Sequence, residues 1–237
     1  MNQQRIDQLK KIVADNYQQI ADQFAVTRQK PFWPELRQII RHLPISGNLL
    51  DIGCGNGRLL EELKKRPLNN YTGLDLSSQL LAIAARQYPA GSCPFTVTWQ
   101  LGDLLDKPTG QQFDFVCCIA ALHHIPGKNN RQLAAKNLAA WLKPGGYLII
   151  SVWDLWRQPK YWLKLFASLA LTLTGQLDSG DLLFNWGQQK KPGSQRYYHA
   201  FTGHELKKLF FTTGLQLIDY RRDGLNHYLV ARQSAKS

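Results

Sequence analysis

The sequence lacks any long run of apolar residues. Its longest such stretch, 165–173, is far shorter than the roughly 20 residues that cross a bilayer. Residues 1–11 are polar and contain no apolar core of the kind that a secretory signal needs. We therefore expect a protein that acts in the cytoplasm and has no membrane partner.

Cysteine is also scarce, with four residues in 237. Cys117 and Cys118 are adjacent inside an apolar run, and the other two stand apart, so neither a CxxC pair nor a disulfide pattern is present. The neighbouring histidines His123 and His124 have no third metal ligand nearby in the sequence. We expect reduced thiols and no metal site.

Acidic side chains are few compared with basic ones: 17 Asp and Glu stand against 29 Lys and Arg, which gives a net charge of +12. An excess of this size attracts polyanions, so nucleic acid is a natural partner, although charge alone does not establish it. With 44% apolar and 11% aromatic residues, the chain is long enough for one sizeable core.

From residue 47 onward, short apolar runs alternate with helical patterns. Strands separated by single helices pair in parallel through right-handed crossovers, and an Asp-Gly turn signal joins the last two strands. The sequence predicts an α/β fold, with seven mostly parallel strands, an antiparallel last strand and helices on both faces. We expect strands at 48–53, 71–77, 95–103, 113–122, 147–154, 215–223 and 225–233, and helices at 58–65, 78–88, 130–142 and 204–214.

Two segments lie outside this alternating pattern. We expect one domain over 1–237, built from a helical N-terminal segment (1–44), an α/β core (45–154), an insertion (155–195) and a closing helix and strand pair (196–237).

The stretch "LLDIGCGNG" (49–57) places Asp51 just before Gly53 and Gly55, where the first strand ends. Such glycines let the backbone turn sharply and approach a ligand closely. The third glycine comes one residue earlier than in the dinucleotide pattern, and a carboxylate suits an ammonium group better than a diphosphate. The loop therefore favours S-adenosylmethionine over a dinucleotide.

Asp75 and Asp103 follow the next two strands. Asp75 is placed to accept both hydroxyls of a ribose, and Asp103 to accept from an adenine amine, with Leu104 on the ring. Each aspartate alone is as readily a helix cap or a solvated turn. Because the carboxyl ends of parallel strands meet at one edge, the two together predict an adenosine site.

Residues 48–153, with the turn "LKPGG" and the closing strand pair, resemble the class I S-adenosylmethionine-dependent methyltransferases, which have a Rossmann-like fold. The resemblance implies S-adenosylmethionine as cofactor and S-adenosylhomocysteine as product. It also implies a helical lid formed by 1–44 and a substrate side formed by 155–195. The implied cofactor residues are Asp51, Gly53, Cys54, Gly55, Asp75, Leu76, Asp103, Leu104 and Ala120.

The motifs "YQQIADQFAVTRQKPFWP", "LLDIGCGNG", "AALHHI", "GDLLFNW" and "RYYHAF" occur in this order. They are similar to those of the tRNA methyltransferases that esterify the carboxymethyl group on wobble uridine, although "LFNW" departs from that family's valine-proline version. The resemblance implies the tRNA anticodon loop as partner, and the family often works with a small zinc-containing activator subunit. The substrate-side residues are then Tyr17, Thr27, Arg28, His123, His124, Arg196, Tyr197, Tyr198 and His199.

The chemistry of an ester-forming transfer fits these residues. A carboxylate is ionised at pH 7 and needs no general base, so alignment supplies the rate. An arginine would hold the carboxylate or a neighbouring phosphate, and Tyr197 or Tyr198 would stack on an unpaired base. We expect Phe201 to pack inward. The residues expected to position the substrate are Arg28, Arg196, Tyr197 and His199.

Structural alternatives remain for these candidates. Tyr17, Ile20 and Phe24 form the stripe of an amphipathic helix, and one of two adjacent histidines often only packs. The stretch 161–175 would either wall a pocket for a small acid or lipid-like metabolite, or form an amphipathic helix that covers the site or docks a partner. A methyltransferase of such a small molecule, and a non-catalytic cofactor-binding subunit, stay open as functions.

Overall fold

The computed structural model describes residues 1–27, 30–185 and 195–235, so Arg28 and residues 186–194 lie outside the described residues. The helices are α1 (Gln3–Gln19), α2 (Ala21–Thr27), α3 (Pro34–His42), α4 (Arg58–Leu63), α5 (Ser78–Gln87), α6 (Lys128–Ala140), α7 (Trp162–Leu173) and α8 (Gly203–Phe211). Short 3-10 turns occur at η1 (Leu122–His124), η2 (Leu155–Arg157) and η3 (Pro159–Tyr161). The strands are β1 (Gly47–Ile52), β2 (Leu68–Asp75), β3 (Thr96–Leu101), β4 (Phe113–Ile119), β5 (Leu142–Trp153), β6 (Asp181–Asn185), β7 (Gln195–His199), β8 (Gln216–Arg222) and β9 (Asn226–Arg232).

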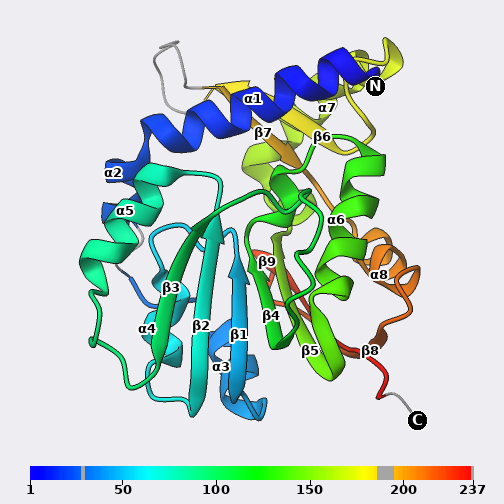
Figure 1. Cartoon of the computed structure of the whole chain (residues 1–237). Coiled ribbons are helices and arrows are strands. Elements are labelled where there is room, and N and C mark those ends of the chain that lie inside the picture. Colours follow the sequence, from blue (N-terminus) through cyan, green and yellow to red (C-terminus); the bar gives the residue numbers. More distant parts are fainter. Residues whose placement is uncertain (28–29, 186–194, 236–237) are drawn as a thin grey trace.

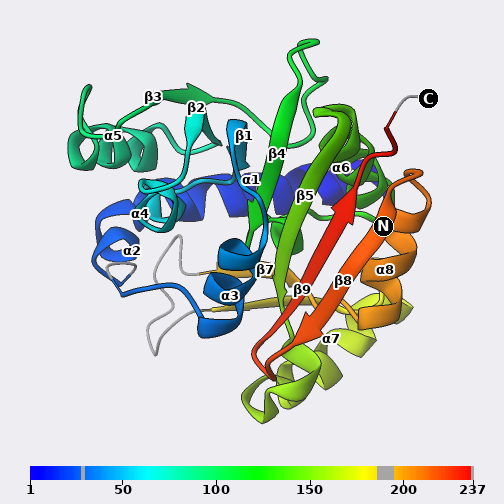
Figure 2. The ribbon, with the colours of Figure 1, turned by 90° about the horizontal axis from the view of Figure 1, so that it is seen from below.

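Seven strands form the main sheet, in the order β3-β2-β1-β4-β5-β9-β8 (Figures 1 and 2). Strands β1 to β5 pair in parallel, and β9 pairs antiparallel with both β5 and β8. This confirms the predicted fold class. The winding reverses between β1 and β4, and in such sheets the crevice outside the carboxyl ends at this reversal is where ligands bind.

Each face of the sheet packs against its own helices. In β4, Val116 and Cys118 point into a core that α6 and α8 complete, whereas Phe115 and Cys117 point into one that α3 and α4 complete. Because both faces are covered, the central strands read as continuous apolar runs rather than alternating ones. Phe201 is fully buried in the first core, as expected.

Strand β5 begins earlier than the sequence suggested. The stretch "KPGG" was expected to be a turn before it, but Leu142 already pairs with Phe113 and the strand runs through to Trp153. The register shifts between Phe113 and Phe115, and Gly145 has a positive φ of 79°, so the turn-forming residues are taken up as an irregularity inside the strand.

A second, two-stranded antiparallel sheet of β6 and β7 was not predicted. It lies above the carboxyl ends of the main strands, together with α1, which runs across that edge (Figure 1). Leu183 and Tyr197 on one face of this ribbon pack with α1, and Leu182 and Tyr198 on the other pack with Tyr161. None of the described helices is long and apolar enough to cross a bilayer.

Candidate active site

A cavity of ≈ 350 Å³ opens at the carboxyl ends of β1, β2 and β4, at the point where the winding reverses. Its floor is the glycine-rich loop after β1, and its walls come from the ends of the neighbouring strands. Helices α1 and α2 and the segment around Phe32 and Trp33 close it from above. Volumes of a few hundred Å³ at this position suit a small cofactor.

The glycine loop forms this floor because its backbone takes conformations that favour glycine. Gly53 has a φ of 70°, and a Cβ built on it would lie 2.4 Å from the Cβ of Ala121. Gly55 has a φ of 56°, and a Cβ there would lie 3.4 Å from the ring of Phe24, which lies over it from α2. Side chains at these two positions would therefore crowd Ala121 and Phe24, and glycine keeps the cavity open here.

Asp75, at the end of β2, lies in the cavity wall and also supports the loop. Its Oδ2 accepts a hydrogen bond from the Gly55 amide at 2.8 Å, and its Oδ1 accepts one from the Ser77 amide at 2.9 Å. Burial raises the pKa of this carboxyl, while the amides of Ser77 and Gly55 oppose the rise. Free lone pairs on both oxygens remain for the hydroxyls of a ribose.

Asp51 lies beneath the loop and not among the residues that line the cavity. The hydroxyl of Tyr71 donates to its Oδ2 at 2.6 Å. Burial, opposed by the Tyr71 hydrogen bond and assisted by the nearby Asp75 carboxylate, raises the pKa of Asp51 to about 7. A carboxyl with such a pKa responds strongly to a cation bound above it.

Asp103 and Leu104 line the cavity on the side of β3. The Asp103 carboxylate accepts from the Leu105 amide at 2.9 Å, and the Lys10 ammonium of α1 lies 3.9 Å from it. Lys10 and Lys11 also line the cavity and were not identified from the sequence. Their spacing from Tyr17, about two helical turns, is the signal that would have placed them on the same face of α1.

Ala120, at the tip of β4, is the one described residue other than glycine with a positive φ, at 55°. Its amide donates to the Ser151 carbonyl of β5 at 2.9 Å, and the residue lines the cavity opposite the glycine loop. Cys54 and Leu76 also line it, and burial raises the pKa of the Cys54 thiol well above its usual value. Backbone held in a sparsely populated conformation is typical of functional sites.

Besides the Lys10–Asp103 ion pair, further polar contacts attach the lid to the core. Tyr17 of α1 and His124 of η1 share a hydrogen bond of 2.7 Å between the hydroxyl and Nε2, and both line the cavity. Arg58, at the start of α4, donates to the carbonyls of Lys30 and Pro31 at 3.0 and 2.7 Å. Its guanidinium also lies 4.0 Å from the centre of the Phe32 ring. Arg58 was not identified from the sequence.

The residues of β7 divide between two faces, because side chains alternate along a strand. Arg196 and Tyr198 lie on one face, where the Tyr198 ring stacks on Trp153 with centres 5.0 Å apart and lies 4.8 Å from His124. Trp153 and His124 line the cavity, and the fully buried Tyr198 packs behind them. A guanidinium nitrogen of Arg196 donates to the Tyr198 hydroxyl at 3.5 Å.

Tyr197 and His199 lie on the opposite face, away from the cavity, contrary to the expectation that four consecutive residues meet the substrate. Both are buried and share the Asp181 carboxylate, which accepts from the Tyr197 hydroxyl at 2.7 Å and lies 2.7 Å from Nδ1 of His199. Arg131 lies 3.6 Å from the same carboxylate, and Glu205 lies 2.8 Å from Nε2 of His199. This network fixes β7 from behind.

The remaining substrate-side candidates are also placed. His123 is fully buried, and its Nδ1 accepts from the Trp153 amide at 3.3 Å, so it supports the cavity wall from behind. The Thr27 hydroxyl donates to the Phe24 carbonyl at 2.8 Å at the exposed end of α2. Within the described ranges 1–27, 30–185 and 195–235, no three His, Cys, Asp or Glu side chains gather as a metal site would require.

A sheet of this order, a glycine loop under a cavity at its winding reversal, and acidic residues at the tips of β1 and β2 define the class of S-adenosylmethionine-dependent methyltransferases. The chain belongs to this class: residues 9–220 match the family model described as a methyltransferase domain. Asp75, the glycine loop and Asp103 fit the cofactor, because carboxylates at the cavity wall suit its ribose hydroxyls and amines.

Relatives of the chain act on different substrates. It is 28% identical over 230 residues to the tRNA (carboxymethyluridine(34)-5-O)-methyltransferase of Schizosaccharomyces pombe, covering 92% of this chain and 94% of that protein. It is 32% identical over 145 residues to the Arabidopsis thaliana enzyme of the same name, of which it spans only 33%. It is also 34% identical over 185 residues to the ubiquinone biosynthesis O-methyltransferase of Coxiella burnetii, covering 78% of this chain and 70% of that protein.

Solved structures share the fold. A methyltransferase of Methanosarcina mazei superimposes with a TM-score of 0.72 at 21% identity, covering 87% of this chain and all of that one. A Haloferax volcanii methyltransferase in complex with the Trm112 methyltransferase activator superimposes with a TM-score of 0.65 at 14% identity, covering 95% and 99%.

Proposed function

We propose that the protein methylates the carboxylate of a carboxymethyl-type group on the wobble uridine of tRNA. The observation that carries this proposal is the side of the cavity formed by Trp153, which the buried Tyr198 ring supports from behind, with the partly exposed Arg196 next along this face of β7. An aromatic ring in the cavity wall with a cation nearby suits an unpaired base and its anionic substituent. The match to the fission yeast tRNA enzyme over almost its whole length supports the same substrate.

The chemistry needs alignment more than acid or base catalysis. The bound cofactor supplies a methyl group on a positively charged sulfur, which takes the bonding electron pair when the carbon–oxygen bond forms. Asp75 and Asp103 would hold the adenosine part, and Asp51 would attract the ammonium group from beneath the loop. Arg196 would hold the substrate carboxylate or a neighbouring phosphate, and no group has to remove a proton.

Tyr197 and His199 act in this proposal as positioning residues, since they hold β7 through Asp181. Thr27 and Arg28 stay candidates for contact with the RNA. A tRNA substrate would place the enzyme in the cytoplasm. Because a neighbour in the fold occurs with the Trm112 activator, a small zinc-containing subunit of that type is a partner to include in any assay.

A second candidate function is O-methylation of a small acid or a lipid-like metabolite, which the Coxiella burnetii relative favours. His124 lies in the cavity wall and could take a proton from a hydroxyl substrate. The stretch 161–175 does not line the described cavity, so it is not the pocket wall that the sequence suggested for this function.

The test is transfer of a tritiated methyl group to total tRNA from cells that lack the protein, with and without the activator subunit, followed by mass spectrometry of the nucleosides. We expect a methyl ester on a wobble uridine. Cofactor binding in calorimetry together with no transfer to tRNA, with the activator present, would contradict the tRNA proposal. Transfer to a small phenol or acid under the same conditions would establish the second function instead.

A further inference from the structure

Helix α7 exposes an apolar face and buries a more polar one. Its exposed residues span three turns and about half of the helix circumference, and none of them carries a polar side chain. Leu163 and Leu173 are more than 80% exposed, and Phe166 is 72% exposed. The exposed residues, here called the α7 face, are Trp162, Leu163, Phe166, Ala167, Leu169, Ala170 and Leu173.

The opposite side of α7 packs against the protein. Leu165 and Leu171 contact the apolar clusters on either side of the β6–β7 ribbon, Ser168 is buried, and Thr172 hydrogen-bonds the Ser168 carbonyl. The helix lies at the periphery, beside the ribbon and away from the seven-stranded sheet (Figures 1 and 2). Helices normally turn apolar side chains inward, so a reversed face of this size marks an interaction surface.

The charges around the α7 face are all positive. The segment 155–177 contains three cations, Arg157, Lys160 and Lys164, and no aspartate or glutamate. Within the described part of the chain, no carboxylate lies within ion-pair distance of Lys160 or Lys164. Burial lowers the pKa of Lys164, and the nearby charge of Lys160 lowers it further. These cations lie at the N-terminal end of the helix, as do the partly exposed rings of Trp156 and Trp162.

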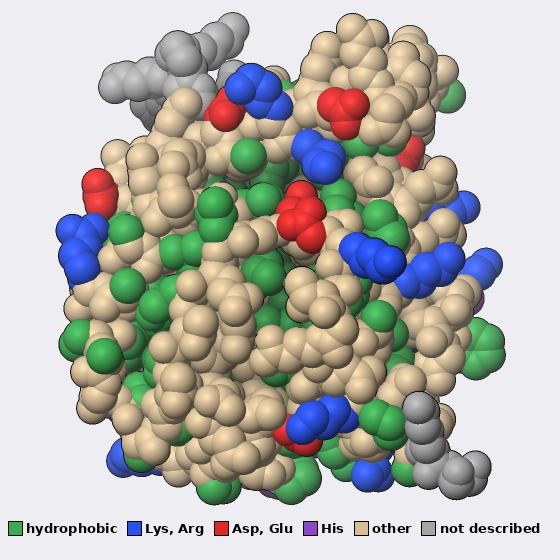
Figure 3. Space-filling view, viewed as in Figure 1, with side chains coloured by type: hydrophobic (Ala, Val, Ile, Leu, Met, Phe, Trp, Pro, Cys, Tyr) green, Lys and Arg blue, Asp and Glu red, His purple; other side chains and the backbone are tan. Residues whose placement is uncertain are grey.

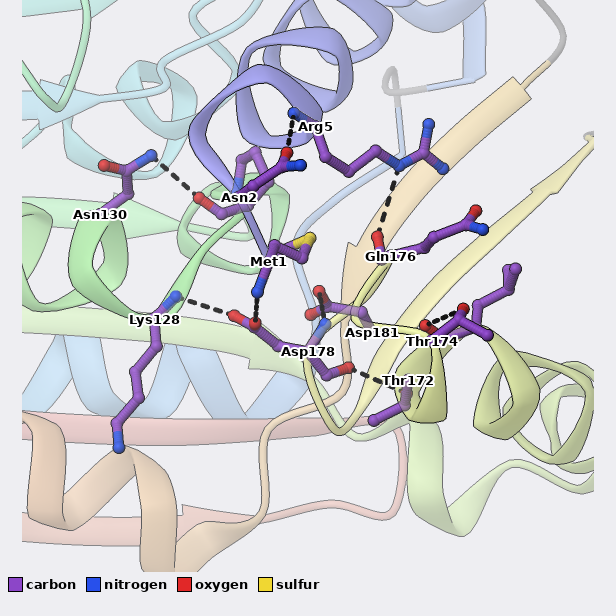
Figure 4. A network of polar contacts seen from close by, with 12 residues as sticks. Met1, Asn2, Arg5, Lys128, Asn130, Thr172, Thr174, Gln176, Asp178 and Asp181 are labelled. Carbon is purple, nitrogen blue, oxygen red and sulfur yellow. Dashed lines mark hydrogen bonds and ion pairs between the residues drawn. The ribbon is translucent and has the colours of Figure 1, made fainter.

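Carboxylates on neighbouring elements do not offset these cations. Asp178, which follows α7, faces the other way and is 3.2 Å from Arg131. It is also 3.4 Å from the N-terminal ammonium of Met1 (Figure 4). Its carboxylate also accepts from the Lys128 amide at 2.9 Å. Asp154, before η2, is fully buried and paired with Arg222 at 2.6 Å. The α7 face therefore combines apolar side chains with unneutralised positive charge.

We propose that the α7 face docks on the surface of a membrane that contains anionic lipids, with the helix lying in the plane of the interface. Leucine and phenylalanine would enter the acyl boundary, the tryptophan rings would lie at headgroup level, and the exposed Arg157 and Lys160 would meet lipid phosphates, whereas the Lys164 ammonium lies 3.9 Å from the centre of the Phe184 ring. This is a surface contact, compatible with the absence of a spanning helix among the described residues. It does not depend on which substrate the enzyme methylates.

The same observations disfavour two other occupants. A second copy of the chain would bring together two molecules of charge +12, with cations beside both apolar faces. An RNA would meet the lysines but would leave leucine and phenylalanine without a partner. An anionic bilayer satisfies both the apolar and the charged parts of the surface.

The test is sedimentation of the full-length protein with vesicles of phosphatidylcholine, with or without added phosphatidylglycerol. We expect binding to the anionic vesicles, weak binding to the neutral ones, and at least a tenfold loss of affinity in the double variant Leu163→Ser, Phe166→Ser. The matched control is Phe211→Ser with Leu133→Ser, which removes two exposed apolar side chains from α8 and α6 and should leave binding unchanged.

Further measurements compare the folding, the cofactor binding and the oligomeric state of the double variant with those of the wild type. Circular dichroism and S-adenosylhomocysteine binding should be the same for the double variant and the wild type, since the α7 face is exposed and remote from the cavity lining. Equal vesicle binding of wild type and double variant, or no binding to either lipid mixture, would overturn the proposal. So would a concentration-dependent dimer in light scattering that the double variant abolishes, because the face would then bind a second copy.

Discussion

The hydroxyl of Tyr17 and Nε2 of His124 lie 2.7 Å apart, and this contact joins the lid helix α1 to the tip of β4 across the cavity. The rings of Tyr17 and Phe24 meet edge to face at 5.5 Å, so the same tyrosine also positions the aromatic side chain that lies over Gly55. His124 in turn packs against Tyr198 at 4.8 Å. The lid, the cofactor loop and the proposed substrate wall are thus linked through two side chains.

Substitution Tyr17→Phe keeps the ring and removes the hydrogen bond to His124. One such bond contributes about 0.5–1.5 kcal/mol, so methyl transfer should slow by about three- to tenfold, with S-adenosylhomocysteine binding weakened by a smaller factor. Methyl-transfer assays quenched at fixed times measure the rate, and calorimetry measures the affinity for S-adenosylhomocysteine. Tyr147→Phe is the matched control, because Tyr147 stacks on Phe115 in the sheet, far from the cavity lining. Equal loss in both variants would contradict a role for the Tyr17 hydroxyl.

Asp75→Ala removes the acceptor for the Gly55 and Ser77 amides and for the ribose. We expect cofactor affinity to fall by at least about tenfold, which corresponds to 1.4 kcal/mol, and the glycine loop to become more mobile. Calorimetry with S-adenosylhomocysteine measures the first effect, and hydrogen exchange of the Gly55 amide the second. Asp7→Ala is the control, because Asp7 is an exposed residue of α1 whose carboxylate accepts from Gln3 and does not line the cavity. Unchanged affinity in Asp75→Ala would remove Asp75 from the cofactor site.

The sequence predicted the seven-stranded sheet well because each of its elements carries its own signal. The glycines after β1 and the aspartates at the ends of β2 and β3 were predicted to lie together at one edge of the sheet, because parallel strands bring their carboxyl ends to the same edge. Asp75, Asp103 and Leu104 accordingly line one cavity. Asp51 lies beneath the loop instead, since its side chain on β1 faces Tyr71, which spacing alone does not reveal.

The substrate side was harder to predict. The sequence assigned no strands to 181–185 or 195–199, so the alternation that separates Arg196 and Tyr198 from Tyr197 and His199 was not foreseen. The net charge of +12 predicted a polyanionic partner but not where on the surface it would bind. In Figure 3 the Lys and Arg side chains are scattered around this face rather than gathered in one stripe, so charge alone does not locate an RNA path.

The alternation along β7 predicts different effects for the neighbours Arg196 and Tyr197. Arg196→Ala should raise KM for tRNA by about tenfold or more, since a hydrogen bond to a charged group contributes about 1.5–3 kcal/mol, and should leave S-adenosylhomocysteine affinity unchanged. Tyr197→Phe should instead lower the free energy of unfolding by about 1–3 kcal/mol, because it removes one of the donors to the buried Asp181 carboxylate. Thermal unfolding and steady-state kinetics separate the two classes. A rise in KM for Tyr197→Phe with normal stability would show that β7 presents both faces to the substrate.

Asp51 predicts a pH dependence of cofactor binding. Its pKa is about 7 in the folded protein, above the ordinary 3.8, so folding favours the protonated form, and the stability it contributes at low pH is lost as the pH rises from about 4 to 7. An ammonium group on the ligand favours the ionised form of Asp51, so cofactor affinity should rise with pH as Asp51 loses its proton. We expect S-adenosylhomocysteine to bind about tenfold more tightly at pH 8 than at pH 6.

The variant Asp51→Asn isolates this effect, because its amide oxygen can still accept from the Tyr71 hydroxyl but does not titrate in this range. Its affinity should be the same at pH 6 and pH 8 and should equal or fall below that of the wild type at pH 6. Without ligand, Asp51→Asn should gain thermal stability relative to the wild type as the pH rises from 5 to 8, since the wild type alone must ionise a buried carboxyl. If Asp51→Asn keeps the wild-type pH profile for binding, another group is responsible for that profile. Asp75, whose pKa is also raised by burial, would then be the next residue to substitute.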